Sequence, residues 1–180
     1  MAKKTETTEA AVLRRDALKH LGQGAVTASY DADLPEVVRM LNLALATELV
    51  CVLRYRRHHF MARGIHARIV ATEFLAHSSE ELGHADSLAA RIVQLGGEPD
   101  FSPSGLSARS HAEYIPGTTL FDMVRENLVA ERIAIQSYRE TIQFLGDKDT
   151  TTSDLLKRIL AAEEEHADEL ASLLTGMPDD

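Results

Sequence analysis

The chain carries two copies of a Glu-x-x-His motif, and a further glutamate precedes each copy at a similar distance along the sequence. The six residues are Glu48, Glu81, His84, Glu131, Glu163 and His166. A glutamate and a histidine three residues apart on an α-helix lie on the same face, so each motif can bind one metal ion. Mixed carboxylate and imidazole donors favour iron, with manganese as the alternative, over zinc–thiolate or all-oxygen calcium chemistry. The pattern therefore predicts a two-metal site within one chain.

Each of the four glutamates interrupts an otherwise apolar helical face, where burial is expected. A buried, unpaired carboxylate costs several kcal/mol, and four carboxylates buried together would repel one another and take up protons. Two divalent cations carry the charge that balances four carboxylates and two neutral imidazoles. We therefore expect two metal ions per chain.

Four long helices are expected to position these residues, because apolar side chains recur at helical spacing and no alternating strand pattern occurs. Prolines and glycines delimit the helices at 35–63, 66–95, 118–145 and 153–175, and a short extra helix is expected at 9–21. The segment 98–117, with three prolines, joins the two pairs. The prediction is an all-α four-helix bundle, in which two antiparallel hairpins are joined by a long crossover.

An internal repeat supports this arrangement. Residues 48–56 match residues 131–139 at Glu, Tyr and Arg, and residues 81–89 match residues 163–171 at six positions that include Glu and His. Two similar hairpins related by a pseudo-two-fold axis would present Glu and Glu-x-x-His twice around one centre.

Length and composition fit one globular domain of 180 residues, with 44% hydrophobic and 26% charged residues. We expect an N-terminal extension at 1–34, the bundle at 35–176 and a tail at 177–180. The net charge of −9 argues against nucleic-acid binding. The single cysteine, Cys51, excludes a disulfide within the chain and an all-cysteine metal site. No apolar run is long enough for a membrane span and no targeting signal is convincing, so a cytoplasmic location is expected.

Over residues 35–175 the sequence resembles the ferritin-like di-iron carboxylate superfamily, most closely the bacterioferritins. The resemblance implies that the six residues bind two iron ions as a ferroxidase centre, with Glu81 and Glu131 as the bridging carboxylates. It also implies that Tyr55 lies beside the site, and we predict that Tyr55 is a catalytic residue that handles electrons or a radical. The implied activity is oxidation of Fe(II) to Fe(III) by O2 or H2O2, for iron storage or detoxification, in a homo-oligomer that forms a hollow shell.

The sequence departs from this family in two places. Bacterioferritins bind haem through a methionine that directly follows the glutamate of the second helix, and Leu82 occupies that position here, so no haem is expected. The chain continues for only 14 residues after His166, which is too short for the family's fifth helix. The expected shell size is therefore left open between 24 subunits, 12 subunits and a smaller oligomer.

Other readings of the same bundle are a rubrerythrin-like peroxidase, a manganese catalase and a DNA-protecting shell of the Dps type. A single cysteine is incompatible with the rubredoxin domain of rubrerythrins, and Dps proteins place their site between subunits.

Two further residues are of interest. His77, one turn before Glu81, could support the ligands, hold iron transiently or simply pack, whereas Tyr138 is interpreted as a packing residue.

Overall fold

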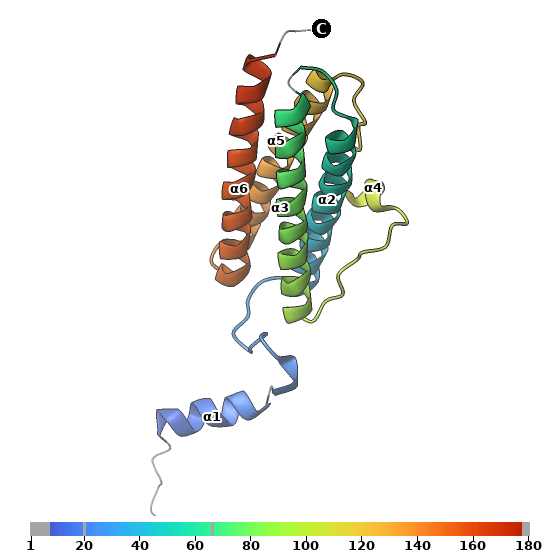
Figure 1. Ribbon diagram of the computed structural model, residues 1–180. Helices are drawn as coiled ribbons and strands as arrows, with labels where there is room; N and C mark the ends of the chain where they lie inside the picture. Colours follow the sequence, from blue (N-terminus) through green and yellow to red (C-terminus); the bar gives the residue numbers. More distant parts are fainter. Residues whose placement is uncertain (1–7, 20, 66, 178–180) are drawn as a thin grey trace, which may run out of the picture.

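Four long helices form an antiparallel bundle in the computed structural model, which describes residues 8–19, 21–65 and 67–177 (Figure 1). The helices are α2 (Leu34–Met61), α3 (Ala67–Gln94), α5 (Leu120–Leu145) and α6 (Thr150–Thr175). Helices α2 and α3 form one hairpin and α5 and α6 the other. The connection between them runs along the outside of the bundle and includes the short helix α4 (Leu106–Arg109). No strand occurs in these three ranges, so the predicted all-α bundle with a long crossover is confirmed.

Side-chain caps determine where three of the long helices, α2, α5 and α6, begin. Asp33 accepts a backbone hydrogen bond from the first turn of α2. Thr119 and Asp122 form a capping box at the start of α5. Asp149 accepts from the backbone N–H of Thr152 at 2.9 Å, so α6 begins three residues earlier than the sequence pattern predicted. Such caps satisfy N–H groups that have no partner within the helix.

The core consists of two apolar clusters with a polar layer between them. One cluster is built around Leu41, Leu45 and Leu88, and the other around Tyr55 and Phe74. In every long helix the glutamate of the predicted site falls between the stretches that supply the two clusters. The bundle therefore carries four carboxylates across its centre at one level.

The N-terminal segment contains helix α1 (Glu9–Lys19), where a short helix was expected, and the 3-10 turn η1 (Leu21–Gln23). Both lie beyond one end of the bundle (Figure 1). The hydroxyl of Tyr30 donates to Asp149 at 2.8 Å and so ties the end of this segment to α6. No helix in the described part of the chain is long and apolar enough to cross a membrane.

Replacing Asp149 by Ala is expected to lower the free energy of unfolding of the metal-free protein by about 3–5 kcal/mol. The buried carboxylate pairs with Arg91 at 2.9 Å and caps α6, so its loss leaves a buried guanidinium without its ion pair. The control is Asp154→Ala, which removes an exposed partner of Lys157 and is expected to change stability by no more than about 0.5 kcal/mol. Urea unfolding followed by circular dichroism measures both; equal effects would contradict the role given to Asp149.

Candidate metal centre

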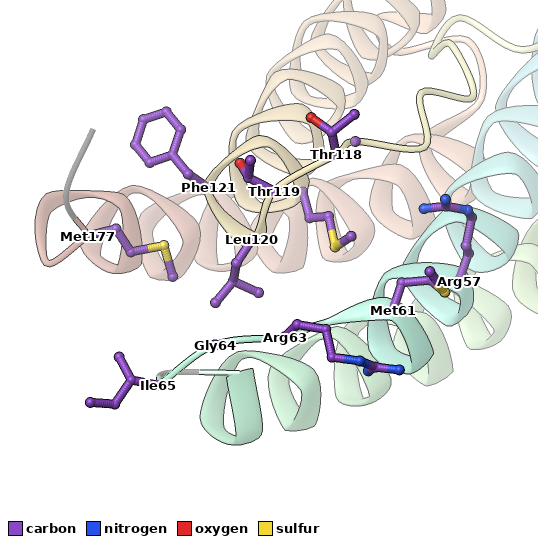
Figure 2. A pocket seen from close by; sticks show the side chains of 12 residues that line it. Arg57, Met61, Arg63, Gly64, Ile65, Thr118, Thr119, Leu120, Phe121 and Met177 are labelled. Atoms are coloured by element: carbon purple, nitrogen blue, oxygen red, sulfur yellow. The ribbon is translucent and has the colours of Figure 1, made fainter. Parts of the chain in front are cut away.

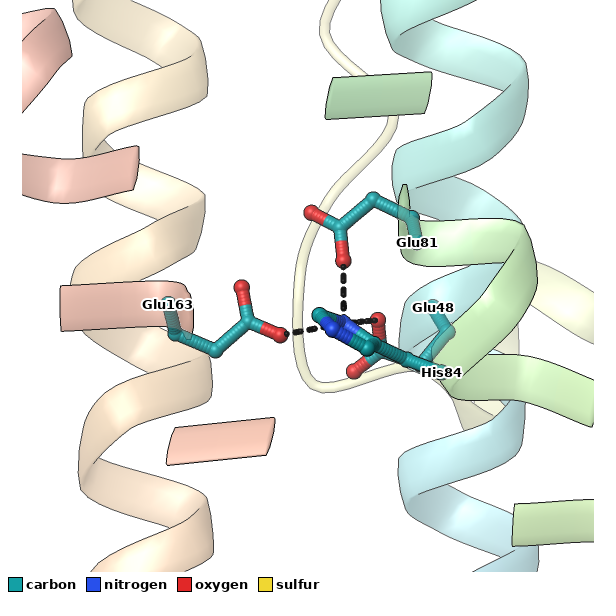
Figure 3. Close-up of side chains that lie close together, drawn as sticks. All are labelled: Glu48, Glu81, His84 and Glu163. Carbon is teal, nitrogen blue, oxygen red and sulfur yellow. Dashed lines mark hydrogen bonds and ion pairs between the residues drawn. The ribbon is translucent and has the colours of Figure 1, made fainter. Parts of the chain in front are cut away.

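The structure brings all six predicted residues together in the polar layer. Their ligand atoms form two groups, and the atoms of each group lie within 4.8 Å of one another. The first group consists of Glu48, Glu81, His84 and Glu163 (Figure 3). The second group consists of Glu81, Glu131, Glu163 and His166. Each group combines three carboxylates with one imidazole, which is a donor set for one metal ion.

Two carboxylates belong to both groups and direct one oxygen toward each histidine. The Nδ1 atom of His84 lies 3.1 Å from Oε2 of Glu81 and 3.0 Å from Oε1 of Glu163. The Nδ1 atom of His166 lies 3.8 Å from Oε1 of Glu81 and 3.6 Å from Oε2 of Glu163. Glu81 and Glu163 are therefore the residues with the geometry of bridging ligands.

This geometry corrects the expectation that Glu131 shares the bridging role with Glu81. Glu131 belongs to one group only, and one of its oxygens accepts the hydroxyl proton of Tyr55. The internal repeat gives the reason, because it pairs Glu81 with Glu163 and Glu48 with Glu131. A pseudo-two-fold axis through the centre makes the members of each pair equivalent, so Glu163 is expected to share the role of Glu81.

Five of the buried ligand atoms lack hydrogen-bond partners. Glu48, Glu81, Glu131 and Glu163 are each at most 2% exposed. Among the residues that the structure describes, Oε1 of Glu81, Oε2 of Glu131, both oxygens of Glu163 and Nδ1 of His166 make no hydrogen bond. A buried polar atom without a partner is costly and rare in native structures. Metal ions bound among these atoms would satisfy them, so the residues present fit a dinuclear metal site.

Two tyrosines hold the carboxylates that are not shared. Tyr55 donates its hydroxyl proton to Glu131, and Tyr138 donates to Glu48. The two tyrosines occupy equivalent positions in the repeat, so the packing role given to Tyr138 was incomplete. The repeat itself was the signal that could have revealed it. On the other side of the centre, Nε2 of His166 lies 2.8 Å from the exposed carboxylate of Glu80, which orients the imidazole.

Burial and mutual repulsion control the charges of the metal-free site. Burial, together with the neighbouring carboxylates, raises the pKa values of Glu81 and Glu131 well above the ordinary range. Burial alone would lower the pKa of His84, but the negative carboxylates of Glu163 and Glu48 beside its imidazole outweigh this effect and raise the pKa to about 10. For Glu163, burial alone would raise the pKa, but the imidazoles of His166 and His84 close to its carboxylate hold the pKa at about 2. Protons therefore occupy the site that metal ions would take.

The centre lies inside the bundle, where its four glutamates are at most 2% exposed. A cavity of about 770 Å³ lies instead at the end of the bundle where α2 meets α3, and Met61, Ile65 and Leu120 line part of it (Figure 2). None of the six residues borders that cavity. The site between the helices accordingly suits ions and small molecules rather than a large organic substrate.

Comparisons with known proteins agree with the fold. Residues 38–179 match the sequence model of the ferritin family, described as a ferritin-like domain, and the chain belongs to this family. It is 33% identical over 141 residues to bacterioferritin BfrA of Mycobacterium tuberculosis, covering 78% of this chain and 84% of the relative. It is 30% identical over 149 residues to the DNA protection during starvation protein of Pyrococcus furiosus, covering 81% and 80%.

Solved structures give the same result. The dodecameric thioferritin of Bacteroides fragilis, a bacterioferritin-related protein, superimposes with a TM-score of 0.78 at 30% identity. The match covers 91% of this chain and 94% of that one. Dps from Thermosynechococcus elongatus, with a TM-score of 0.75 at 23% identity, shares the fold.

The metal-free protein is expected to become less stable as the pH rises from about 7 to about 9. The raised pKa values of Glu81, Glu131 and His84 mean that the native state holds protons that the unfolded state releases, and this stabilisation is lost as the pH climbs toward those values. Burial lowers the pKa values of His58 and His77. These two residues change the stability only at lower pH, because over this interval they are neutral in both the unfolded and the native state.

Thermal melting in the presence and absence of saturating Co(II) measures this dependence. Bound metal replaces the protons, so the melting temperature of the loaded protein is expected to stay level or rise over the same interval. Parallel slopes with and without Co(II) would show that the ion does not occupy the carboxylate layer.

Proposed function

We propose that the protein is a ferroxidase, which oxidises Fe(II) to Fe(III) with O2 or H2O2 in iron storage or detoxification. The observation that carries this proposal is the pair Glu81 and Glu163, each of which directs one oxygen toward each histidine. Two Fe(II) ions held together supply two electrons at once. That number reduces O2 to H2O2, or H2O2 to water, with the uptake of two protons.

Charge balance explains how the site would take up its substrate and release its product. Four carboxylates neutralise two Fe(II) ions in a medium where an uncompensated charge is costly. Oxidation adds two positive charges, which the same four carboxylates no longer balance. The ferric product would therefore need further anions, such as hydroxide from water with release of protons, and would take these with it when it leaves the centre.

The surrounding residues would orient the ligands and exclude water. Tyr55 and Tyr138 fix one oxygen each of Glu131 and Glu48, so the remaining oxygens face the ions. Glu80 fixes the ring of His166. Residues that orient metal ligands typically contribute about 10–100-fold to affinity or activity. The similarity to bacterioferritins supports iron over manganese as the metal.

Replacing Glu81 by Gln is expected to slow Fe(II) oxidation by more than about 100-fold, because it removes a shared ligand rather than a residue that orients one. The melting temperature of the metal-free variant is expected to hold or rise, since the amide relieves repulsion among buried carboxylates and leaves no cavity. The control is Glu165→Gln, an exposed position on α6. Stopped-flow absorbance after an oxygen pulse measures the rate, and wild-type protein is expected to oxidise two Fe(II) per chain in the rapid phase.

Unchanged oxidation in the Glu81→Gln variant would exclude Glu81 as a ligand. If H2O2 is instead consumed rapidly while no iron accumulates, the peroxidase or catalase reading is favoured. Binding of plasmid DNA at physiological salt would favour a Dps-type role.

We also propose that the chain assembles with copies of itself into a hollow shell that holds the ferric product. The dodecameric assembly of the similar Bacteroides fragilis protein supports twelve chains of 19.8 kDa. Light scattering before and after iron loading is expected to give that mass and then an increase from mineral. A particle of 24 chains, or a small oligomer that gains no mass, would contradict this assembly.

The absence of haem and the cytoplasmic location stay predictions. A Soret band in purified protein would contradict the absence of haem.

A further inference from the structure

A third cluster of metal-binding side chains lies one helical turn from the dinuclear centre. It consists of Glu73 and His77 on α3 and Glu169 on α6, whose ligand atoms lie within 4.8 Å of one another. His77 is buried with 2% exposure, whereas the side chain of Glu169 is 47% exposed. We propose that this cluster binds a third divalent metal ion, on the solvent side of the dinuclear centre.

The contacts of His77 leave its Nε2 atom facing a carboxylate oxygen, a geometry in which a metal ion can be bound. The hydroxyl proton of Tyr55 is donated to Glu131, so the Tyr55 oxygen can only accept from Nδ1 of His77, which lies 3.2 Å away. Nδ1 must then carry a proton, as in a histidine that binds metal through Nε2. Nε2 faces the carboxylate of Glu169 at 2.8 Å. Two such acceptors cannot approach each other unless a cation, either a proton or a metal ion, lies between them.

The internal repeat shows that the bundle does not need this cluster for packing. The positions equivalent to Glu73, His77 and Glu169 are occupied by Leu155, Ile159 and Ser87. Leu155 and Ile159 pack into the apolar core at the other end of the bundle. The six central ligands follow the pseudo-symmetry, but these three positions do not. Each of the three carries a metal-binding side chain, whereas its equivalent in the repeat is Leu, Ile or Ser.

The cluster is in direct contact with the centre. The ring of His77 stacks on the ring of His166 with a centroid separation of 4.1 Å, and Tyr55 joins His77 to Glu131. Two carboxylates and a neutral imidazole balance one divalent ion, and the mixed donors favour Fe(II), Mn(II) or Co(II) over Ca(II). If the proposed ferroxidase function holds, this ion is Fe(II) waiting beside the centre; binding itself does not depend on that function.

Anaerobic titration with Co(II), followed by its visible absorption, tests the proposal on the intact protein. Wild-type protein is expected to bind three Co(II) per chain. The double variant Glu73→Gln/Glu169→Gln is expected to bind two, with the third ion weakened at least about tenfold. The matched control is Asp86→Asn/Glu165→Gln, which neutralises one exposed carboxylate on each of the same helices outside the clusters and is expected to keep all three.

Each outcome decides one question. A wild-type stoichiometry of two, or a double variant that still binds three, overturns the third site and leaves the ferroxidase proposal intact. Loss of one ion in the double variant, combined with absent Fe(II) oxidation in wild-type protein, supports the third site and overturns the ferroxidase. Glu81→Gln is expected to disturb the central pair and keep the third ion; loss of all three overturns an independent site. If the double variant does not fold by circular dichroism, Glu169→Gln alone and anomalous scattering from Co(II)-loaded wild-type crystals give the answer.

Discussion

The layer of four buried carboxylates between two apolar clusters is the constraint on which the structure depends. No apolar side chain can compensate this charge. The protons that the metal-free site takes up compensate it only in part, because both oxygens of Glu163 remain without hydrogen bonds. Histidines supply positive or neutral nitrogen donors on two helices, and tyrosines hold one oxygen of each unshared carboxylate. The two histidines, the two tyrosines and Glu80 are thus arranged as they would be around bound cations.

Pseudo-two-fold symmetry is the means by which one chain builds such a centre. Each hairpin contributes a glutamate that is held by a tyrosine and a Glu-x-x-His motif, so the shared ligands must be the equivalent pair Glu81 and Glu163. Where the symmetry breaks, the two ends of the bundle acquire different properties. Tyr55 contacts His77, while the position equivalent to His77 is the apolar Ile159 in the core. The site therefore has one polar side that reaches solvent through Glu169 and one apolar side that does not.

Much of this arrangement could be predicted from the sequence, because helical periodicity, the motif spacing and the repeat all act within or between straight helices of similar length. The six ligands and the bundle follow from these regularities. The assignment of Glu131 as a bridging ligand followed a resemblance, whereas the repeat and the geometry favour Glu163 as the partner of Glu81. The contact of Tyr30 with Asp149, and the meeting of Glu169 with His77, depend on the path of an irregular segment and on how α3 packs against α6. No local pattern encodes either contact.

The most direct test of the central claim is the location of metal ions by anomalous scattering in crystals of the Co(II)-loaded protein. The account predicts two ions in the carboxylate layer, separated by about 3.5–4 Å as in other two-metal sites. Both ions should be ligated by Glu81 and Glu163, with Glu48 and His84 on one and Glu131 and His166 on the other. A single ion in the layer, or a pair bridged through Glu131 in place of Glu163, would contradict the account.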